Sequence, residues 1–99
     1  SAALYDDVFI KLNIPQGSKV LDIDCRSGNG TVFFKQLYPN STFFSGAMSE
    51  SFKQSCSERL EKNDLVSNVF LYDDYLLPFE DNFFDYVFSY ETLEHILHF

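Results

Sequence analysis

A small glycine turn, Gly28-Asn29-Gly30, follows an apolar segment and is the first feature of this sequence that could bind a ligand. Glycines at the start of a helix let the backbone approach a ligand closely and direct amide N–H groups toward it. The alternative is a tight strand-to-helix turn with no ligand, which two glycines alone favour. The turn has neither the G-x-G-x-x-G pattern of dinucleotide-binding proteins nor the Gly-Lys-Ser/Thr of a P-loop.

Residues that commonly bind metals or transfer protons are sparse. His95 could act as a general base, because unperturbed histidine titrates near neutral pH, although an ordinary helix residue is the more frequent alternative. His95 and His98 are close in sequence, and the chain has two cysteines, Cys25 and Cys56. No pair among them has the spacing of a zinc motif, so we predict no metal site.

Composition and charge narrow the class of protein. The chain has 99 residues, with 12 Phe, 6 Tyr and a formal net charge of -8, which excludes a disordered acidic tail poor in aromatic residues. Its 7 Lys and Arg residues are scattered singly, so we predict no nucleic-acid binding by this segment. Apolar runs are too short for a membrane-spanning helix, and no signal peptide is visible. Two cysteines without such a signal favour reduced thiols and a cytoplasmic protein.

The hydrophobic pattern alternates between the periods of helices and strands. Predicted helices cover residues 3–13, 30–38, 49–62 and 91–98, and predicted strands cover 19–24, 42–45, 68–72 and 84–89. We expect Ser49 to cap the third helix, and Phe52, Cys56 and Leu60 to form its buried stripe. The alternation predicts an α/β fold, with a Rossmann-like, doubly wound parallel sheet in the strand order 3-2-1-4.

Ligands of such sheets bind beyond the carboxyl ends of the strands. Functional residues are therefore expected in the segments that follow the four strands. These segments are residues 22–30, 46–50, 73–75 and 89–95.

Three stretches of the sequence carry a family resemblance. Val20–Gly30, with the sequence VLDIDCRSGNG, resembles the first motif of class I S-adenosylmethionine-dependent methyltransferases. Leu77–Ser89, with the sequence LPFEDNFFDYVFS, resembles the family's Leu-Pro-Phe loop and fourth strand, and Leu93-Glu94-His95-Ile96 is similar to the helix start that follows. The resemblance covers nearly the whole chain in order and spacing, and it is closest to the branch that acts on small molecules.

This resemblance implies cofactor-binding roles for five residues. Asp22 would support the amino group of the methionyl part of S-adenosylmethionine, and Gly28 would bring the loop close to the cofactor. Asp73 would lie near the adenine amino group, with Tyr75 beside the adenine. Ser89 would lie beside the reactive methyl group. For Asp22 and Asp73 the alternative is a strand-end carboxylate that only caps nearby amides.

Three further positions depart from the family pattern. Asp24 and Arg26 replace two of the three motif glycines, and each would cost roughly 1 kcal/mol or more if its backbone needs a positive φ. Both would crowd the methionyl end of the cofactor, although Arg26 could instead pair with the cofactor's carboxylate. Met48 stands where the family has an acid that binds both ribose hydroxyls. A thioether cannot accept those bonds, whose loss costs roughly 1.5–3 kcal/mol.

The resemblance implies that residues 1–99 form a partial methyltransferase domain, its cofactor-binding half. The implied activity is methyl transfer from S-adenosylmethionine to a small molecule, largely through proximity, so no catalytic residue is predicted. The alternative is a catalytically inactive, degenerate or truncated scaffold or partner module. A dinucleotide oxidoreductase is a weaker alternative, because both the glycine fingerprint and the ribose acid are missing.

The family fold has seven strands, and this sequence carries the first four. The fourth strand would then be an uncovered apolar edge, so we expect self-association or a partner chain that completes the sheet. Because of Asp24, Arg26 and Met48, we expect the chain alone to bind S-adenosylmethionine weakly or not at all.

Overall fold

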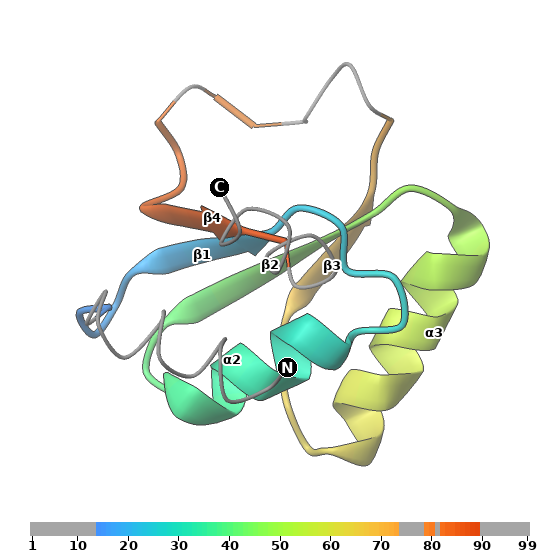
Figure 1. Cartoon of the computed structure of the whole chain (residues 1–99), viewed down its shortest axis with the longest axis horizontal. Helices are drawn as coiled ribbons and strands as arrows, with labels where there is room; N and C mark the ends of the chain where they lie inside the picture. Colours follow the sequence, from blue (N-terminus) through green and yellow to red (C-terminus); the bar gives the residue numbers. More distant parts are fainter. Residues whose placement is uncertain (1–13, 74–78, 81, 90–99) are drawn as a thin grey trace, which may run out of the picture.

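A computed structural model describes residues 14–73, 79–80 and 82–89 of the chain (Figure 1). The elements in these ranges are β1 (Lys19–Asp22), α2 (Asn29–Leu37), β2 (Thr42–Ala47), α3 (Glu50–Lys62), β3 (Asn68–Leu71) and β4 (Tyr86–Phe88). The helices predicted over 3–13 and 91–98 lie outside the described residues, as does Tyr75.

The four strands form one parallel sheet in the order β3-β2-β1-β4. In β1, Leu21 lies opposite Phe44 of β2 and Val87 of β4. In β2, Ser45 lies opposite Val69 of β3. The predicted strand order 3-2-1-4 is confirmed, with β1 between β2 and β4.

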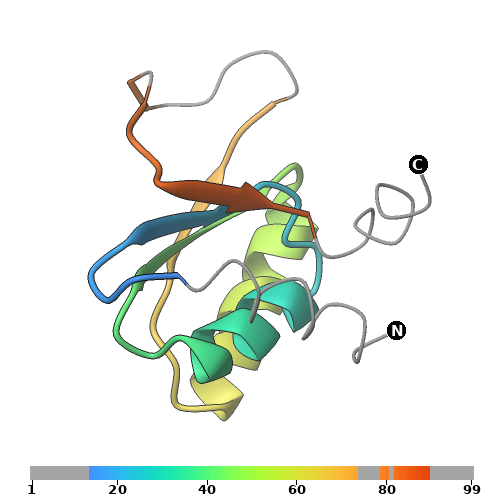
Figure 2. The ribbon, with the colours of Figure 1, turned by 60° about the vertical axis from the view of Figure 1, so that its left-hand side comes forward.

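Helices α2 and α3 pack against one face of this sheet, and Figure 2 shows both on the same side of it. Alternate residues of each strand point to that face, as the strand period requires. The buried apolar residues between the layers form two clusters. The first contains Ile14, Val20, Phe34, Phe43 and Phe88, and the second contains Cys25, Ala47, Cys56 and Leu60. The ring of Phe34 meets the ring of Phe88 edge-on at 4.5 Å between centroids.

The opposite face of the sheet carries an aromatic group. The ring of Phe44 has edge-on contacts with Phe79, Phe83 and Phe84, at centroid distances of 5.5, 5.5 and 5.2 Å. These three rings precede β4, which begins at Tyr86 and not at the predicted residue 84. The Asp85 carboxylate accepts a hydrogen bond from the Lys19 backbone N–H at 2.7 Å, which helps to align the starts of β4 and β1.

The predicted cap of α3 is confirmed, whereas the prediction of its buried stripe is partly wrong. The Ser49 side chain caps the helix by accepting a hydrogen bond from the Phe52 N–H at 3.1 Å. Cys56 and Leu60 are buried, but Phe52 is 39% exposed. A spacing of four residues advances 400° around a helix of about 3.6 residues per turn, so Phe52 is rotated by roughly 80° from Leu60.

Candidate functional site

The loops that follow the strands meet at the carboxyl edge of the sheet, where the functional residues were expected. Three backbone hydrogen bonds connect neighbouring strands there. Ile23 N–H donates to the Phe88 carbonyl at 2.9 Å, Cys25 N–H to the Gly46 carbonyl at 2.9 Å, and Tyr72 N–H to the Ala47 carbonyl at 3.0 Å. The edge is thus a continuous surface built from all four strands.

Asp22 lies at the end of β1 and is fully buried between the sheet and α2. Its Oδ2 atom accepts a hydrogen bond from the Thr31 hydroxyl at 2.8 Å. The Thr31 hydroxyl is also 2.8 Å from the Ser45 hydroxyl, which is 2.7 Å from the Ser67 hydroxyl. A chain of hydroxyl groups therefore joins the carboxylate to β2 and to the segment before β3.

Sequence reasoning missed the three hydroxyl residues of this chain, Thr31, Ser45 and Ser67. A signal was present at Ser45, which lies between Phe43 and Ala47 on the helix-facing side of β2. A polar residue at an inward position of an apolar strand needs a buried hydrogen-bond partner. Its partners come from α2 and from the segment before β3, so the local pattern could not identify them.

Gly28 ends the loop after β1 and is the N-cap residue of α2, with φ +90°. Its N–H donates to the Cys25 carbonyl at 2.7 Å. A Cβ atom at this position would lie 3.2 Å from both Cα and Sγ of Cys56 in α3. The structure therefore supplies a packing reason for this glycine, namely the close approach of the loop to α3.

Arg26 and Asp24 lie in the same loop and form an ion pair. The Arg26 Nε atom is 3.1 Å from Asp24 Oδ2, and the Arg26 side chain is 47% exposed. Arg26 has φ +46°, whereas Asp24 is not among the residues with positive φ. The strain anticipated for a replaced motif glycine therefore applies to Arg26 and not to Asp24.

We expect Arg26→Gly to be more stable than Arg26→Ala by about 1 kcal/mol, because only glycine adopts positive φ without a Cβ penalty. Both variants remove the exposed ion pair, which contributes little to stability. The difference between their free energies of unfolding therefore measures the cost of the positive φ alone. Urea denaturation of the two variants measures it. Equal free energies of unfolding would show that the loop relaxes out of the left-handed region.

Met48, Asp73 and Ser89 follow β2, β3 and β4 at this edge. The Met48 side chain is 43% exposed. Asp73 is exposed, and Ser89 is half-buried. The structure brings these three to the same edge as the loop of Gly28, as the sequence predicted, while their cofactor-binding roles stay predictions.

Tyr72 is a further residue of this edge that sequence reasoning missed. Its hydroxyl donates a hydrogen bond to the carbonyl of Ile23, so the side chain of a residue after β3 reaches across to β1. A Cβ atom on Gly46 would lie 2.6 Å from Cε1 of the Tyr72 ring. The ring therefore lies against Gly46 of β2. A glycine inside a strand indicates such a close approach, which is the signal that could have pointed to it.

The thiols of Cys25, in the loop, and Cys56, in α3, are both buried. A hydrogen bond to Cys56, together with burial, raises the pKa of Cys25. Hydrogen bonds from Cys25 and Ser45 lower the pKa of Cys56 against the opposing effect of burial. The two shifts place the pKa of Cys56 below that of Cys25, whose thiol donates a hydrogen bond to the Arg26 carbonyl at 3.8 Å.

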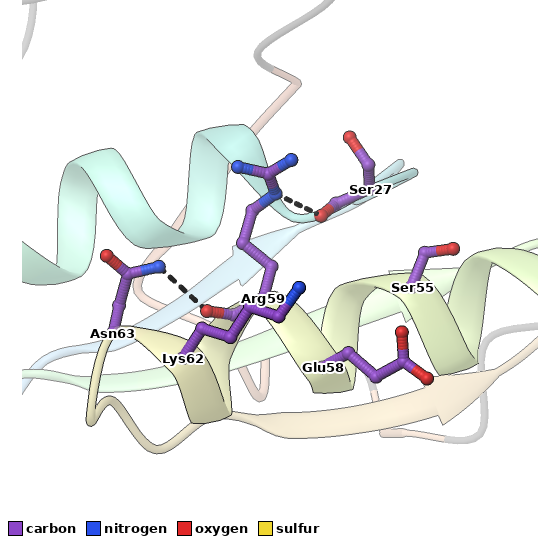
Figure 3. Close-up of a pocket in the computed structure, with 6 residues that line it drawn as sticks. All are labelled: Ser27, Ser55, Glu58, Arg59, Lys62 and Asn63. Atoms are coloured by element: carbon purple, nitrogen blue, oxygen red, sulfur yellow. Dashed lines mark hydrogen bonds between the residues drawn. The ribbon is translucent and has the colours of Figure 1, made fainter.

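A surface pocket of about 330 Å³ lies on α3 beside the loop after β1 (Figure 3). It is lined by Ser27, Ser55, Glu58, Arg59, Lys62 and Asn63. The Arg59 Nε atom donates to the Ser27 carbonyl at 2.9 Å and so ties the loop to α3. None of the predicted cofactor-binding residues lines this pocket, which shares Ser27 with the loop after β1.

Two features are absent from the described residues. No three His, Cys, Asp or Glu side chains within the described ranges are grouped so that they could hold a metal ion. Among the same residues, no helix combines the length and the apolar character that crossing a membrane requires.

Comparison with known proteins gives a family match. Residues 21–98 match the model of a family described as "Methyltransferase domain". No curated protein gave a significant match.

Three solved structures illustrate the similarity. Coclaurine N-methyltransferase, in a structure bound to N-methylheliamine and SAH, is 25% identical with a TM-score of 0.71, and the match covers 86% of this chain and 25% of that one. TehB from Haemophilus influenzae is 26% identical with a TM-score of 0.66, and the match covers 85% of this chain and 28% of TehB. The [4+2]-cyclase SpnF is 19% identical with a TM-score of 0.77, and the match covers 87% of this chain and 32% of SpnF. At this identity the similarity shows the fold alone. The match spans about a third of the length of solved structures similar to this chain, with 35%, 36% and 32% in three of them.

Proposed function

The chain belongs to the methyltransferase domain family, and on that premise we propose that it is the cofactor-binding half of an S-adenosylmethionine-dependent methyltransferase that acts on a small molecule. The observation that carries this proposal is the family match over residues 21–98, which includes the loop of Gly28 and all of the carboxyl edge. The match favours an enzyme over the alternative of an inactive scaffold. We also propose a cytoplasmic location, supported by two free cysteines in the described residues.

The residues of the carboxyl edge suit this cofactor in part. The loop after β1 ends at the N-terminus of α2, where backbone N–H groups can face a polar ligand. Asp73 offers an exposed carboxylate at the same edge, suited to an amino group. When bound, S-adenosylmethionine supplies an electrophilic methyl group on a sulfonium, and the role proposed for this chain is to bind and orient that group.

The β2 side of the edge suits the cofactor less well. Met48 has a thioether where two ribose hydroxyls would need an acceptor, and the Tyr72 ring lies against Gly46 close by. Arg26, in its left-handed conformation, adds an exposed cation to the loop. These features support weak binding by the chain as it stands.

The likeness to the [4+2]-cyclase is one of fold alone. A shared fold hosts different reactions, so the fold by itself does not identify the chemistry. The proposed reaction therefore depends on the family match and is tested through the cofactor.

We expect Met48→Asp to raise the affinity for S-adenosylhomocysteine about tenfold or more, because a carboxylate restores charge-assisted bonds worth roughly 1.5–3 kcal/mol. The triple change of Asp24→Gly, Arg26→Gly and Met48→Asp should raise it further by opening the loop. Isothermal titration calorimetry on the folded protein measures both affinities.

Val66→Asp is the matched control for that titration. Val66 is 79% exposed and precedes β3, at the opposite end of the sheet, so it adds the same charge away from the edge. An equal gain in affinity for Val66→Asp would contradict a ribose contact at residue 48. Micromolar binding by the unmodified chain would show that the loop tolerates Asp24 and Arg26, and the scaffold alternative would then be excluded.

A further inference from the structure

The pocket between α3 and the loop that follows β1 is lined by polar side chains. Ser55, Glu58, Arg59 and Lys62 are spaced three and four residues apart along α3, so they share one side of the helix. Ser27 of the loop belongs to the same lining. The volume of about 330 Å³ lies at the lower end of the range of roughly 300–1,000 Å³ that small-molecule sites occupy. The pocket therefore has the size and the lining of a site for a small polar molecule.

Two cations of this pocket have no acidic partner, although the chain as a whole is acidic. The sequence has 15 Asp and Glu against 7 Lys and Arg, yet within the described ranges neither Arg59 nor Lys62 forms an ion pair with a carboxylate. Glu58 lies one helical turn before Lys62, but its carboxylate accepts a hydrogen bond from the Gln54 side chain at 3.1 Å. The two positive charges of the pocket are thus available to a ligand.

Arg59 is held in place by contacts that leave the end of its side chain available. Its Nε atom donates to the Ser27 carbonyl at 2.9 Å, and Figure 3 shows the two terminal nitrogens beyond that contact. Asn63 donates to the Arg59 carbonyl at 2.8 Å at the end of α3. In the part of the chain that the structure describes, neither terminal nitrogen of Arg59 donates a hydrogen bond. A guanidinium fixed in this way can bind two oxygens of one phosphate group at once.

We propose that this pocket binds a small phosphate monoester whose alcohol part carries hydroxyl groups. In this site the terminal nitrogens of Arg59 contact two phosphate oxygens, and the Lys62 ammonium balances the second negative charge. A phosphate group directs three oxygens to different sides and so also suits the hydroxyls of Ser27 and Ser55, whereas a carboxylate has two oxygens in one plane. The Glu58 carboxylate is an acceptor only, which suits a hydroxyl of the alcohol part.

The phosphate site is separate from the proposed methyltransferase function and does not depend on it. None of the predicted cofactor-binding residues lines the pocket. Ser27 does lie between Arg26 and Gly28 in the loop, so an occupied pocket touches the neighbour of two of those residues. Because phosphate compounds alone are used as probes below, a failure of the phosphate site and a failure of cofactor binding are distinguished.

Nuclear magnetic resonance of the isotope-labelled chain tests the site, with inorganic phosphate and glycerol phosphate as probes and sodium chloride at equal ionic strength as the reference. We expect saturable shifts of the amide signals of Ser27, Ser55 and Arg59, with a dissociation constant of about 1 mM or lower for glycerol phosphate. Acetate should bind more weakly than inorganic phosphate. Shifts that fail to saturate or that sodium chloride reproduces would overturn the proposal, and so would acetate binding as tight as that of phosphate.

Lys62→Gln removes one of the two charges at an exposed position, where the fold does not depend on it. We expect this variant to bind glycerol phosphate at least about fivefold more weakly. Lys53→Gln is the matched control. Lys53 lies nine residues earlier in α3, which is two and a half turns of about 3.6 residues and places it on the opposite side of the helix. Its replacement should change the affinity by less than about twofold, because salt screens distant exposed charges.

Glu58→Gln should have the opposite effect. It removes a negative charge from the pocket and keeps an acceptor oxygen, so inorganic phosphate should bind at least about threefold more tightly. Equal losses for Lys62→Gln and Lys53→Gln would show attraction to the charge of the whole helix and not to this pocket. A Glu58→Gln variant that binds phosphate no more tightly than the native chain would place the anion elsewhere. Either result would contradict the assignment of the site.

Discussion

Replacing Gly28 with alanine is expected to destabilise the domain by roughly 2–4 kcal/mol. Two independent costs add at this position. The residue has φ +90°, a conformation in which an L side chain costs roughly 1 kcal/mol or more. The new Cβ would also lie 3.2 Å from two Cys56 atoms, one of them the backbone Cα, and overpacking of this kind typically costs about 1–3 kcal/mol.

Gly17→Ala is the control for that experiment. Gly17 has φ +79° with nothing within 4 Å of its added Cβ, so its replacement reports the backbone cost alone, about 1 kcal/mol. Urea denaturation gives the free energies of unfolding of both variants, compared at unchanged m-value. Equal losses in the two variants would contradict the close approach of Gly28 to α3.

The second large effect is expected for Thr31→Val, which keeps the shape of the side chain and removes its hydroxyl. The buried Asp22 carboxylate then loses the bond from Thr31 at 2.8 Å, and Ser45 loses a contact of the same length. Hydrogen bonds to charged groups contribute roughly 1.5–3 kcal/mol, so we expect a loss of that size in the free energy of unfolding.

Two further variants identify the origin of that loss. Thr31→Ser retains the hydroxyl and should recover most of the stability. Thr42→Val makes the same change at an exposed position of β2 and should stay within about 0.5 kcal/mol of the native chain. A Thr31→Val variant as stable as the native chain would show that the hydroxyl chain contributes nothing net to the fold.

The arrangement of the sheet could be predicted because alternation of helices and strands allows few topologies. Short connections and right-handed crossovers leave the order β3-β2-β1-β4 as the simple solution for these segments. The carboxyl edge follows from the same rule, and so does the gathering of Gly28, Met48, Asp73 and Ser89 there.

The contacts within the edge could not be predicted in the same way, because they join residues distant in sequence. Gly28 was interpreted through a cofactor, whereas a Cβ added to it would meet Cys56 of α3. Tyr72 has no local pattern that connects it with Ile23. Phe52 was assigned to the core from its spacing alone, and that spacing does not fix how far around the helix the buried stripe extends.

The position of Tyr72 has a consequence for any ligand that needs the space above Gly46. Such a ligand competes with the protein's own ring, so it binds only the conformers in which the Tyr72 hydroxyl has left the Ile23 carbonyl. Its apparent dissociation constant is then the intrinsic constant divided by the fraction of molecules in that open conformation. A closed population of about 99% would weaken the apparent affinity a hundredfold, with every ligand-contacting residue unchanged. For such a ligand, the affinity of this edge would depend on the conformation of one tyrosine as well as on the contacts that the ligand makes.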